Sequence, residues 1–263
     1  MTNRNKNGSP ISEAQIDQYH RDGYLLVSGL IPDDIAAKAE AAMWRCAGIS
    51  RGNPPTSWEH IQGGICLYNS ADLVNCFTPQ CLAAAAQLTG EDPSTFSKLH
   101  RHPKTYCAPD FLAAQEAKED VSKFFKWDCA YTINIYPTLG EWESPTITSG
   151  GHLDHSLEEH NHKTFPPVFR IGALIYLNDI TPHGGGTYVW PGSHHELERL
   201  ARKNPARYEY RNMLNADLPE FDLGDPIGMT LQRGDVLFLH HLCIHSGSKN
   251  VSNQPRFAMN MKW

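Results

Sequence analysis

Residues 235–245 read "DVLFLHHLCIH", a run of apolar and β-favouring residues that follows a glycine and ends in a histidine. Four more short β-rich runs lie beyond residue 120: "DCAYTINIYP", "RIGALIYLNDI", "GGTYVWPG" and "RFAMNMKW". Gly/Pro turns separate these runs, and such spacing is typical of antiparallel sandwiches and barrels. We therefore predict a mainly β protein with flanking α-helices and a double-stranded β-helix (jelly-roll) core.

The first part of the chain has a helical texture instead. Residues 12–47 have the pattern of a helix, a short apolar strand and a second helix, with Ser12 as the N-cap of the first. Residues 79–90 are alanine-rich and are also predicted to be helical. We expect residues 1–11 to be a disordered N-terminal segment and residues 12–263 to form a single domain.

Composition limits the classes of function. The chain has 263 residues, 40% hydrophobic and 20% charged, as in an ordinary globular protein. Its net charge of -6 gives no support for nucleic-acid or anionic-membrane binding, so we expect a small-molecule function. The seven cysteines include no CxxC pair, and the chain has no signal-peptide stretch. These features favour free thiols in the cytoplasm. Cys243 is expected to be a buried strand thiol rather than a ligand.

Candidate metal ligands occur in "SGGHLDHSLEEHNH", residues 149–162. In a strand, residues i and i+2 point to the same face, so His152 and Asp154 can reach one metal ion while Leu153 points away. A third ligand should come from another strand, and His245 at the end of "DVLFLHHLCIH" is the best candidate. Two histidines and one carboxylate on one face of an octahedral iron leave three positions open.

Arg256 strengthens this interpretation. It follows His245 after the turn "SGSKNVSNQP", which would return its guanidinium to the neighbourhood of the metal. A planar guanidinium there can hold a distal carboxylate in a two-point grip. An isolated HxD pattern is weak, but the order HxD, His, Arg is specific.

With these residues, the chain resembles the Fe(II)/2-oxoglutarate dioxygenases of the phytanoyl-CoA hydroxylase-like family. The matching segments are "QYHRDGYLLVSGLI", "GGHLDH", "GGGTYVWPGSHH", "GDVLFLHHLCIHSGSKN" and "QPRFAMN". The resemblance implies that His152, Asp154 and His245 are the catalytic Fe(II) ligands. It also implies that Arg256 binds the C5 carboxylate of the cosubstrate 2-oxoglutarate.

Two departures from the family pattern concern the cosubstrate site. Many relatives have "HGSG" after the distal histidine, whereas this chain has "HSGS", so either Ser246 or Ser248 is the candidate hydroxyl beside Arg256. Relatives often carry Gln and Lys on the strand before HxD. Here "TINIYP" instead makes Asn134 and Tyr136 the candidates for further cosubstrate contacts.

The remaining histidines are expected not to bind metal. Three of them are interpreted as solvent or substrate-mouth residues: His155, His160 and His162. The others are interpreted as packing or hydrogen-bonding residues, the first two after a turn and the last two in a strand: His194, His195, His240 and His241.

The expected reaction is hydroxylation of an aliphatic C–H of a small molecule, with dioxygen consumed and succinate and CO2 released. The carboxylate of Asp154 favours hydroxylation over halogenation, while desaturation or ring closure remain alternatives. A cupin-type metal isomerase or lyase and a non-catalytic binding protein are the competing classes. The first leaves Arg256 unexplained, and the second should lack a ligand or the arginine.

The sequence does not reveal the substrate. Arg170 and Asn260 are candidate anchors for a polar or anionic substrate, with surface or structural roles as the alternative. Residues 196–233 form a long segment without strand alternation between core strands. Such a segment is expected to be a lid or binding loop, the alternative being an excursion that only packs on the core.

Overall fold

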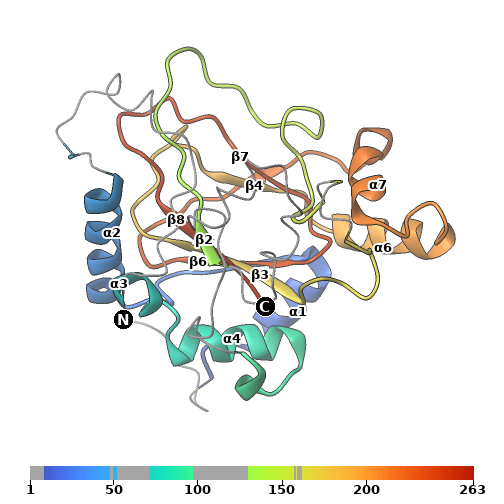
Figure 1. The fold of residues 1–263 in the computed structure, drawn as a ribbon, viewed down its shortest axis with the longest axis horizontal. Helices are drawn as coiled ribbons and strands as arrows, with labels where there is room; N and C mark the ends of the chain where they lie inside the picture. Colours follow the sequence, from blue (N-terminus) through green and yellow to red (C-terminus); the bar gives the residue numbers. More distant parts are fainter. Residues whose placement is uncertain (1–8, 48–49, 52–70, 97–129, 157, 159–161) are drawn as a thin grey trace, which may run out of the picture.

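A computed structural model of the chain describes residues 9–47, 50–51, 71–96, 130–156, 158 and 162–263. Within these ranges the core consists of two antiparallel sheets (Figure 1). The larger has the order β1-β6-β3-β8-β2 and the smaller the order β5-β4-β7. The larger sheet comprises β1 (Tyr24–Val27), β2 (Ala130–Thr132), β3 (Ile171–Tyr176), β6 (Val236–His240) and β8 (Ala258–Lys262). The smaller comprises β4 (Thr187–Val189), β5 (Ile227–Gly228) and β7 (His245–Gly247). The predicted jelly-roll core with flanking helices is confirmed.

Helices flank this core in two groups. One group comprises α1 (Glu13–Asp22), α2 (Asp33–Ala47), α3 (Ala71–Val74), α4 (Pro79–Thr89) and the short 3-10 helix η2 (Pro93–Thr95). The other comprises α6 (Ser193–Lys203), α7 (Arg211–Ala216) and the 3-10 helix η5 (Leu218–Glu220). In Figure 1, α6 and α7 lie at the end of the molecule opposite α2. No described helix is long and apolar enough to cross a membrane.

Helix α1 begins and ends where local chemistry dictates. The Ser12 hydroxyl accepts a hydrogen bond from the backbone N of Gln15, and the Gln15 side chain accepts one from the backbone N of Ser12. This reciprocal capping box confirms the predicted N-cap. Gly23 ends the helix with φ +81°, a left-handed conformation that glycine adopts without strain, and its N–H donates to Tyr19 O.

The larger sheet is buried on both faces. Because successive strand side chains point to opposite faces, β3 divides its residues between two apolar clusters. Ile171, Ala173 and Ile175 pack with the helices of the N-terminal half. Leu174 and Tyr176 pack on the other face, with Val189 of the smaller sheet. The space between the sheets is therefore the interior of the jelly roll.

Residues 235–245 form two strands rather than one. β6 ends at His240, and β7 begins at His245 in the other sheet. Between them the Cys243 N–H donates to His240 O at 2.8 Å, which closes a turn. His241 and Cys243 therefore lie in this turn and not in a strand as predicted, because the chain crosses between sheets here. Cys243 is nevertheless a free, buried thiol.

The predicted disordered segment is too long at its end. Ile11 is 2% exposed and belongs to the core cluster beneath the helices. Ser9 is also tied down, since its hydroxyl donates to Ile11 O at 2.7 Å. Ile11 is thus part of the packed core, while residues 1–8 lie outside the described part of the chain.

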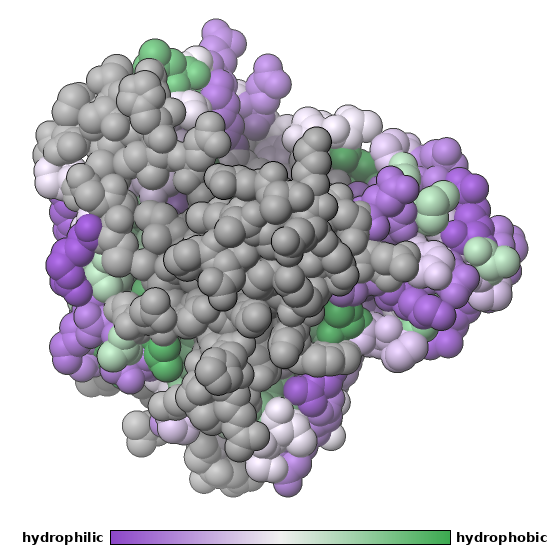
Figure 2. Space-filling view, in the orientation of Figure 1, coloured by the Kyte–Doolittle hydropathy of each residue, from purple (hydrophilic) through white to green (hydrophobic). Residues whose placement is uncertain are grey.

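Residues 196–233 pack on the core. The segment holds most of α6, all of α7 and η5, and also β5, which pairs with β4. The segment was predicted to lack strand alternation, and β5, a strand of two residues, is too short to show any. Hydrophilic residues gather on the outside over α6 and α7 (Figure 2). Apolar residues of the segment, Leu197, Ala201, Leu214 and Leu218, are buried in one cluster.

The histidines at the end of β6 should make the protein sensitive to acid. Burial, together with the neighbouring His194 and Arg211, lowers the pKa of His240 to about 3. As pH falls from about 6.5, the unfolded chain binds a proton here that the folded protein does not, so folding is destabilised until the folded pKa is reached. This residue alone should lower the free energy of unfolding by about 2 kcal/mol between pH 7 and pH 5.

We predict that His240→Asn reduces this pH dependence, measured as urea unfolding at both pH values without metal. Asparagine keeps an acceptor for the Leu242 N–H, which donates to His240 Nδ1 at 3.2 Å. The matched control is His20→Asn at an exposed position. Equal slopes for wild type and His240→Asn would contradict the assignment.

Candidate metal centre

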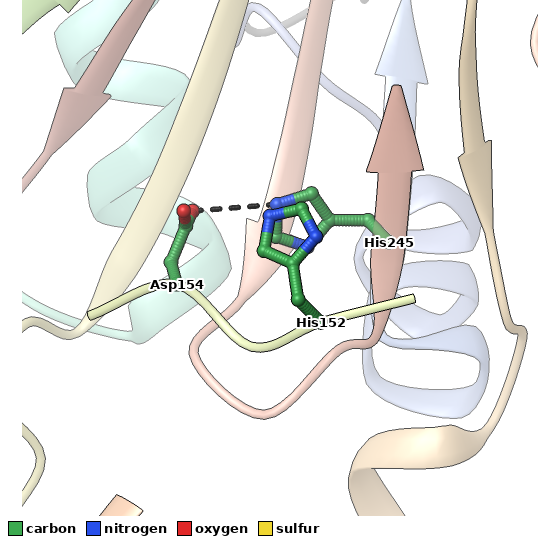
Figure 3. A group of neighbouring side chains, drawn as sticks. All are labelled: His152, Asp154 and His245. Carbon is green, nitrogen blue, oxygen red and sulfur yellow. Dashed lines mark ion pairs between the residues drawn. The ribbon is translucent and has the colours of Figure 1, made fainter. Parts of the chain in front are cut away.

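Two backbone hydrogen bonds join His152 to His245. The N–H of His152 donates to His245 O at 3.1 Å, and the N–H of His245 donates to His152 O at 3.2 Å. Directly opposed residues of an antiparallel pair point to the same face, and the two ring centroids lie 4.6 Å apart. The Asp154 carboxylate completes the group, with one ligand atom of each residue within 4.8 Å of the others (Figure 3). The three predicted ligands are thus brought together.

Only a short piece of the HxD segment is extended. Leu153 points away from the group and is buried at 1% exposure, as the alternation predicts. After Asp154 the chain turns, and His155 has φ +56°, in the left-handed region. His155 is buried, with its ring 5.5 Å from that of Phe169, so the expectation of a solvent or mouth position is wrong. The turn places it beneath the surface.

The histidine rings are oriented by carbonyl groups. His152 Nδ1 lies 2.8 Å from Gly150 O, and His245 Nδ1 lies 3.1 Å from Cys243 O. A carbonyl oxygen only accepts, so each Nδ1 donates to it, and Nε2 is the nitrogen of each ring that is left for a metal. His245 Nε2 points to Asp154, 3.4 Å from Oδ2. Burial and the neighbouring His245 lower the pKa of His152, which favours the neutral ring that a metal requires.

Lys262 is a site residue that sequence reasoning missed. Its Nζ lies 3.0 Å from Asp154 Oδ2, and the lysine is 1% exposed at the end of β8. Burial would raise the pKa of Asp154, but Lys262 and His245 outweigh it, and the pKa lies well below its usual range. The ligand is therefore ionised. Arg256, two residues before β8, has the same parity as residues 260 and 262 within the strand, a signal that could have identified this lysine.

Arg256 lies between the two sheets. It is 2% exposed, and its Nη1 donates to Gly185 O at 3.0 Å and to Thr187 Oγ1 at 3.3 Å. Its Nη2 donates to Ile133 O at 3.4 Å, while Nε has no hydrogen-bond partner among the described residues. No described carboxylate pairs with this guanidinium. A buried, uncompensated positive charge of this kind is a binding point for an anion.

Comparison with protein families identifies the relatives of this chain. The family model described as phytanoyl-CoA dioxygenase (PhyH) matches residues 19–258. The chain belongs to the phytanoyl-CoA dioxygenase family. A search of curated proteins gives no match.

Solved structures with a similar fold include two enzymes from nogalamycin biosynthesis. SnoK, a non-heme alpha ketoglutarate dependent carbocyclase, has a TM-score of 0.61 at 16% identity, with 96% of this chain and 83% of that chain covered. SnoN, an epimerase with the same dependence, has a TM-score of 0.56 at 16% identity, with 95% and 81% covered. EvdO2 from Micromonospora carbonacea var. aurantiaca has a TM-score of 0.56 at 13% identity, with 96% and 90% covered. At these identities the likeness shows a shared fold.

In this member of the phytanoyl-CoA dioxygenase family, the hydroxyl beside Arg256 is that of Thr187. Thr187 pairs with Gly247 across β4 and β7, and a Cβ on Gly247 would lie 3.6 Å from Arg256 Nη1. Ser246 and Ser248 flank Gly247 and therefore point to the other face. Their hydroxyls donate to the carbonyls of the residues that follow them, Gly247 and Lys249. The structure thus brings neither serine to the guanidinium.

Asn134 and Tyr136 also lie away from Arg256. They share a face, as predicted, and the Asn134 amide donates to the Tyr136 hydroxyl at 3.4 Å. This face is directed toward the helices, where Tyr136 packs edge-on against Phe257. Ile135, not its neighbours, pairs with Arg256. The pairing register, which the sequence does not contain, puts these two residues on the wrong side of the sheet for the predicted contact.

The other candidate residues are placed outside the triad. In the described ranges, no other group of three His, Cys, Asp or Glu side chains lies close enough to hold an ion. His160 lies outside those ranges. His194 Nε2 lies 3.0 Å from His20 O, a hydrogen-bonding role as expected. Arg170 pairs with Glu91 and stacks over Phe96, which is a structural role, whereas Asn260 is buried on the Arg256 face of β8.

We predict that the triad variants His152→Ala, Asp154→Ala and His245→Ala each lower the affinity for a divalent metal by more than about 100-fold. Loss of a residue that only orients a ligand typically lowers metal affinity by about 10- to 100-fold, and loss of the ligand itself should lower it more. The measurement is anaerobic Fe(II) or Mn(II) titration of the folded variants.

The control variants are His155→Asn, which suits the left-handed backbone, and His162→Ala. Both should retain metal. Loss of metal from His155→Asn together with retention by His152→Ala would reverse the assignment.

Proposed function

We propose that this protein is an Fe(II)- and 2-oxoglutarate-dependent dioxygenase that hydroxylates an aliphatic C–H of a small molecule, releasing succinate and CO2. One observation carries the proposal. His152, Asp154 and His245 converge in the jelly-roll interior. The same interior contains the buried Arg256, whose guanidinium has no described counter-ion. Membership of the phytanoyl-CoA dioxygenase family supports this interpretation.

The donor set fits ferrous iron. Two neutral imidazoles and one carboxylate on one side of an ion suit Fe(II) and leave positions for other ligands. The Nδ1 contacts of both histidines leave Nε2 for the metal, and the ionised Asp154 is already in the protonation state that binds one. Bound iron would supply the activation of dioxygen that is coupled to oxidation of the 2-oxo acid. SnoN, a structural relative, has been solved with Fe3+ and alpha ketoglutarate.

The protein's own part in the reaction is positioning. Arg256 would hold the distal carboxylate of 2-oxoglutarate, with Thr187 and Gly185 fixing the guanidinium plane. Such a grip would orient the 2-oxo acid with its other end toward the triad. The buried side chains around Arg256 would exclude water from the distal carboxylate.

Hydroxylation is the outcome favoured by the carboxylate of Asp154, which retains a full set of protein ligands. The fold itself accommodates other outcomes, because SnoK is a carbocyclase and SnoN an epimerase. We therefore keep desaturation and ring closure as outcomes of the test. We also propose a cytoplasmic protein, since Cys76, Cys81 and Cys243 are free thiols.

The direct test is succinate release from 2-oxoglutarate by the Fe(II)-loaded protein in air, across a panel of carboxylate, amine and acyl-thioester compounds. A true substrate should accelerate succinate release and gain one oxygen atom in its product by mass spectrometry. A product lighter by two hydrogens would indicate desaturation or ring closure. Absence of succinate in every arm, from a protein that binds iron, would refute the dioxygenase assignment.

We predict that Arg256→Ala weakens 2-oxoglutarate binding by at least about 30-fold, since a buried carboxylate–guanidinium pair contributes roughly 2–5 kcal/mol. Iron affinity should be nearly unchanged, because Arg256 is not a ligand. The measurement is titration of the Fe(II) protein with 2-oxoglutarate under anaerobic conditions.

The control compound is 2-oxobutyrate, which lacks the distal carboxylate. It should bind wild type and Arg256→Ala equally well. A variant that binds 2-oxoglutarate as tightly as wild type would remove Arg256 from the cosubstrate site.

A further inference from the structure

Residues 196–233 pack against the two segments that carry the proposed metal ligands. Leu153, between two of the proposed ligands, is buried in the same apolar cluster as Leu197 of α6 and Leu214 of α7. Leu242 and Ile244, which precede the third ligand, belong to that cluster as well. Both ligand-bearing segments therefore share one packed support, built from a part of the chain that holds no ligand itself.

Arg211, the first residue of α7, joins these two segments by hydrogen bonds. Its side chain is fully buried, with Nη2 donating to Asp154 O at 3.0 Å and Nε donating to the same oxygen at 3.2 Å. The same Nη2 donates to His241 O at 2.6 Å, and Nη1 lies 3.3 Å from His241 Nδ1. One planar guanidinium thus connects the HxD turn to the turn that leads to His245.

Asn215, one helical turn later, holds the other end of the HxD segment. Its Oδ1 accepts a hydrogen bond from the Leu153 N–H at 2.7 Å. With Arg211 on the carbonyl of Asp154, α7 fixes the peptide group before Leu153 and the peptide group after Asp154. The backbone N–H of Arg211 also donates to His162 O at 2.9 Å, which ties down the chain beyond the turn.

From these contacts we infer that Arg211 and Asn215 are positioning residues for the metal centre, and that α7 clamps the HxD turn. The inference rests on the proposed function only in taking the triad as the metal site.

A mechanical reason supports this role. Only His152 of the HxD segment is paired to a strand, and the chain leaves the extended conformation at Asp154. The left-handed His155 that follows is a conformation that needs support from its surroundings. Without the clamp, the Asp154 carboxylate would sample orientations away from the histidines. Outer partners that orient a ligand typically contribute 10- to 100-fold in metal affinity.

The clamp also changes the interpretation of residues 196–233. The segment was expected to be a lid or binding loop, but α7 is wedged behind the ligands by buried hydrogen bonds and apolar packing. For α7, support of the core is the role that these contacts favour.

The decisive test compares Asn215→Ala with Asn215→Asp. Asn215 is only partly buried, so both proteins should fold, but only aspartate retains an acceptor for the Leu153 N–H. We expect Asn215→Ala to lower Co(II) affinity about tenfold or more and to alter the visible Co(II) spectrum, whereas Asn215→Asp stays near wild type. Asn212→Ala, the same change earlier on α7, is the matched control and should bind like wild type.

Arg211→Lys provides a second arm, because lysine keeps the charge but cannot span both carbonyls. Thermal unfolding without metal is measured for each variant, so that a general loss of stability is separated from a loss of affinity. Wild-type Co(II) affinity and spectrum in folded Asn215→Ala would overturn the inference, as would equal losses in Asn215→Ala and Asn215→Asp. If wild type binds metal at the triad but never releases succinate, the proposed function fails while the clamp stands.

Discussion

The pair of hydrogen bonds between the backbones of His152 and His245 is the interaction on which the rest of the site depends. It joins an irregular loop to the smaller sheet at one residue, and it places two imidazoles side by side. The other contacts of the site are arranged around these two imidazoles. Gly150 O and Cys243 O set the tautomers, and the next i+2 position brings a carboxylate to the same face. A shift of one residue in this register would turn both histidines away from each other.

A single bridge is a weak anchor, which explains the density of contacts around Asp154. From the interior, Lys262 pairs with its carboxylate, and from behind, Arg211 holds its carbonyl. The side chain and the backbone of the same residue are thus fixed by two cations from different elements. Neither cation comes from a segment that carries a histidine ligand. The geometry of the metal centre therefore depends on the packing of the whole jelly roll rather than on one loop.

Sequence reasoning found the residues whose positions follow from strand alternation and missed those that depend on pairing. His152 and Asp154 share a face at spacing two, and Arg256 follows a turn, so these needed no knowledge of register. Thr187 was missed, and Asn134 and Tyr136 were placed beside the cosubstrate, because position relative to Arg256 depends on which strand lies opposite. The hydrogen bonds of Arg211 and Asn215 have no periodic signal at all, since they run from a short helix to turns far away in sequence.

Charge balance links the two proposed ligands of the interior, the metal ion and 2-oxoglutarate. Lys262 compensates Asp154 before any metal binds, while Arg256 is buried without a described counter-ion. A divalent cation alone would add two positive charges beside these groups, and a dicarboxylate alone would add two negative ones. When the metal ion and the dicarboxylate are bound together, their charges cancel, so the net charge of the buried site is unchanged. Because uncompensated charge is costly in a low-dielectric interior, binding of either ligand should favour binding of the other. Lys262 at the end of β8 and Arg256 just before its start thereby couple the metal centre to the proposed cosubstrate end of the interior.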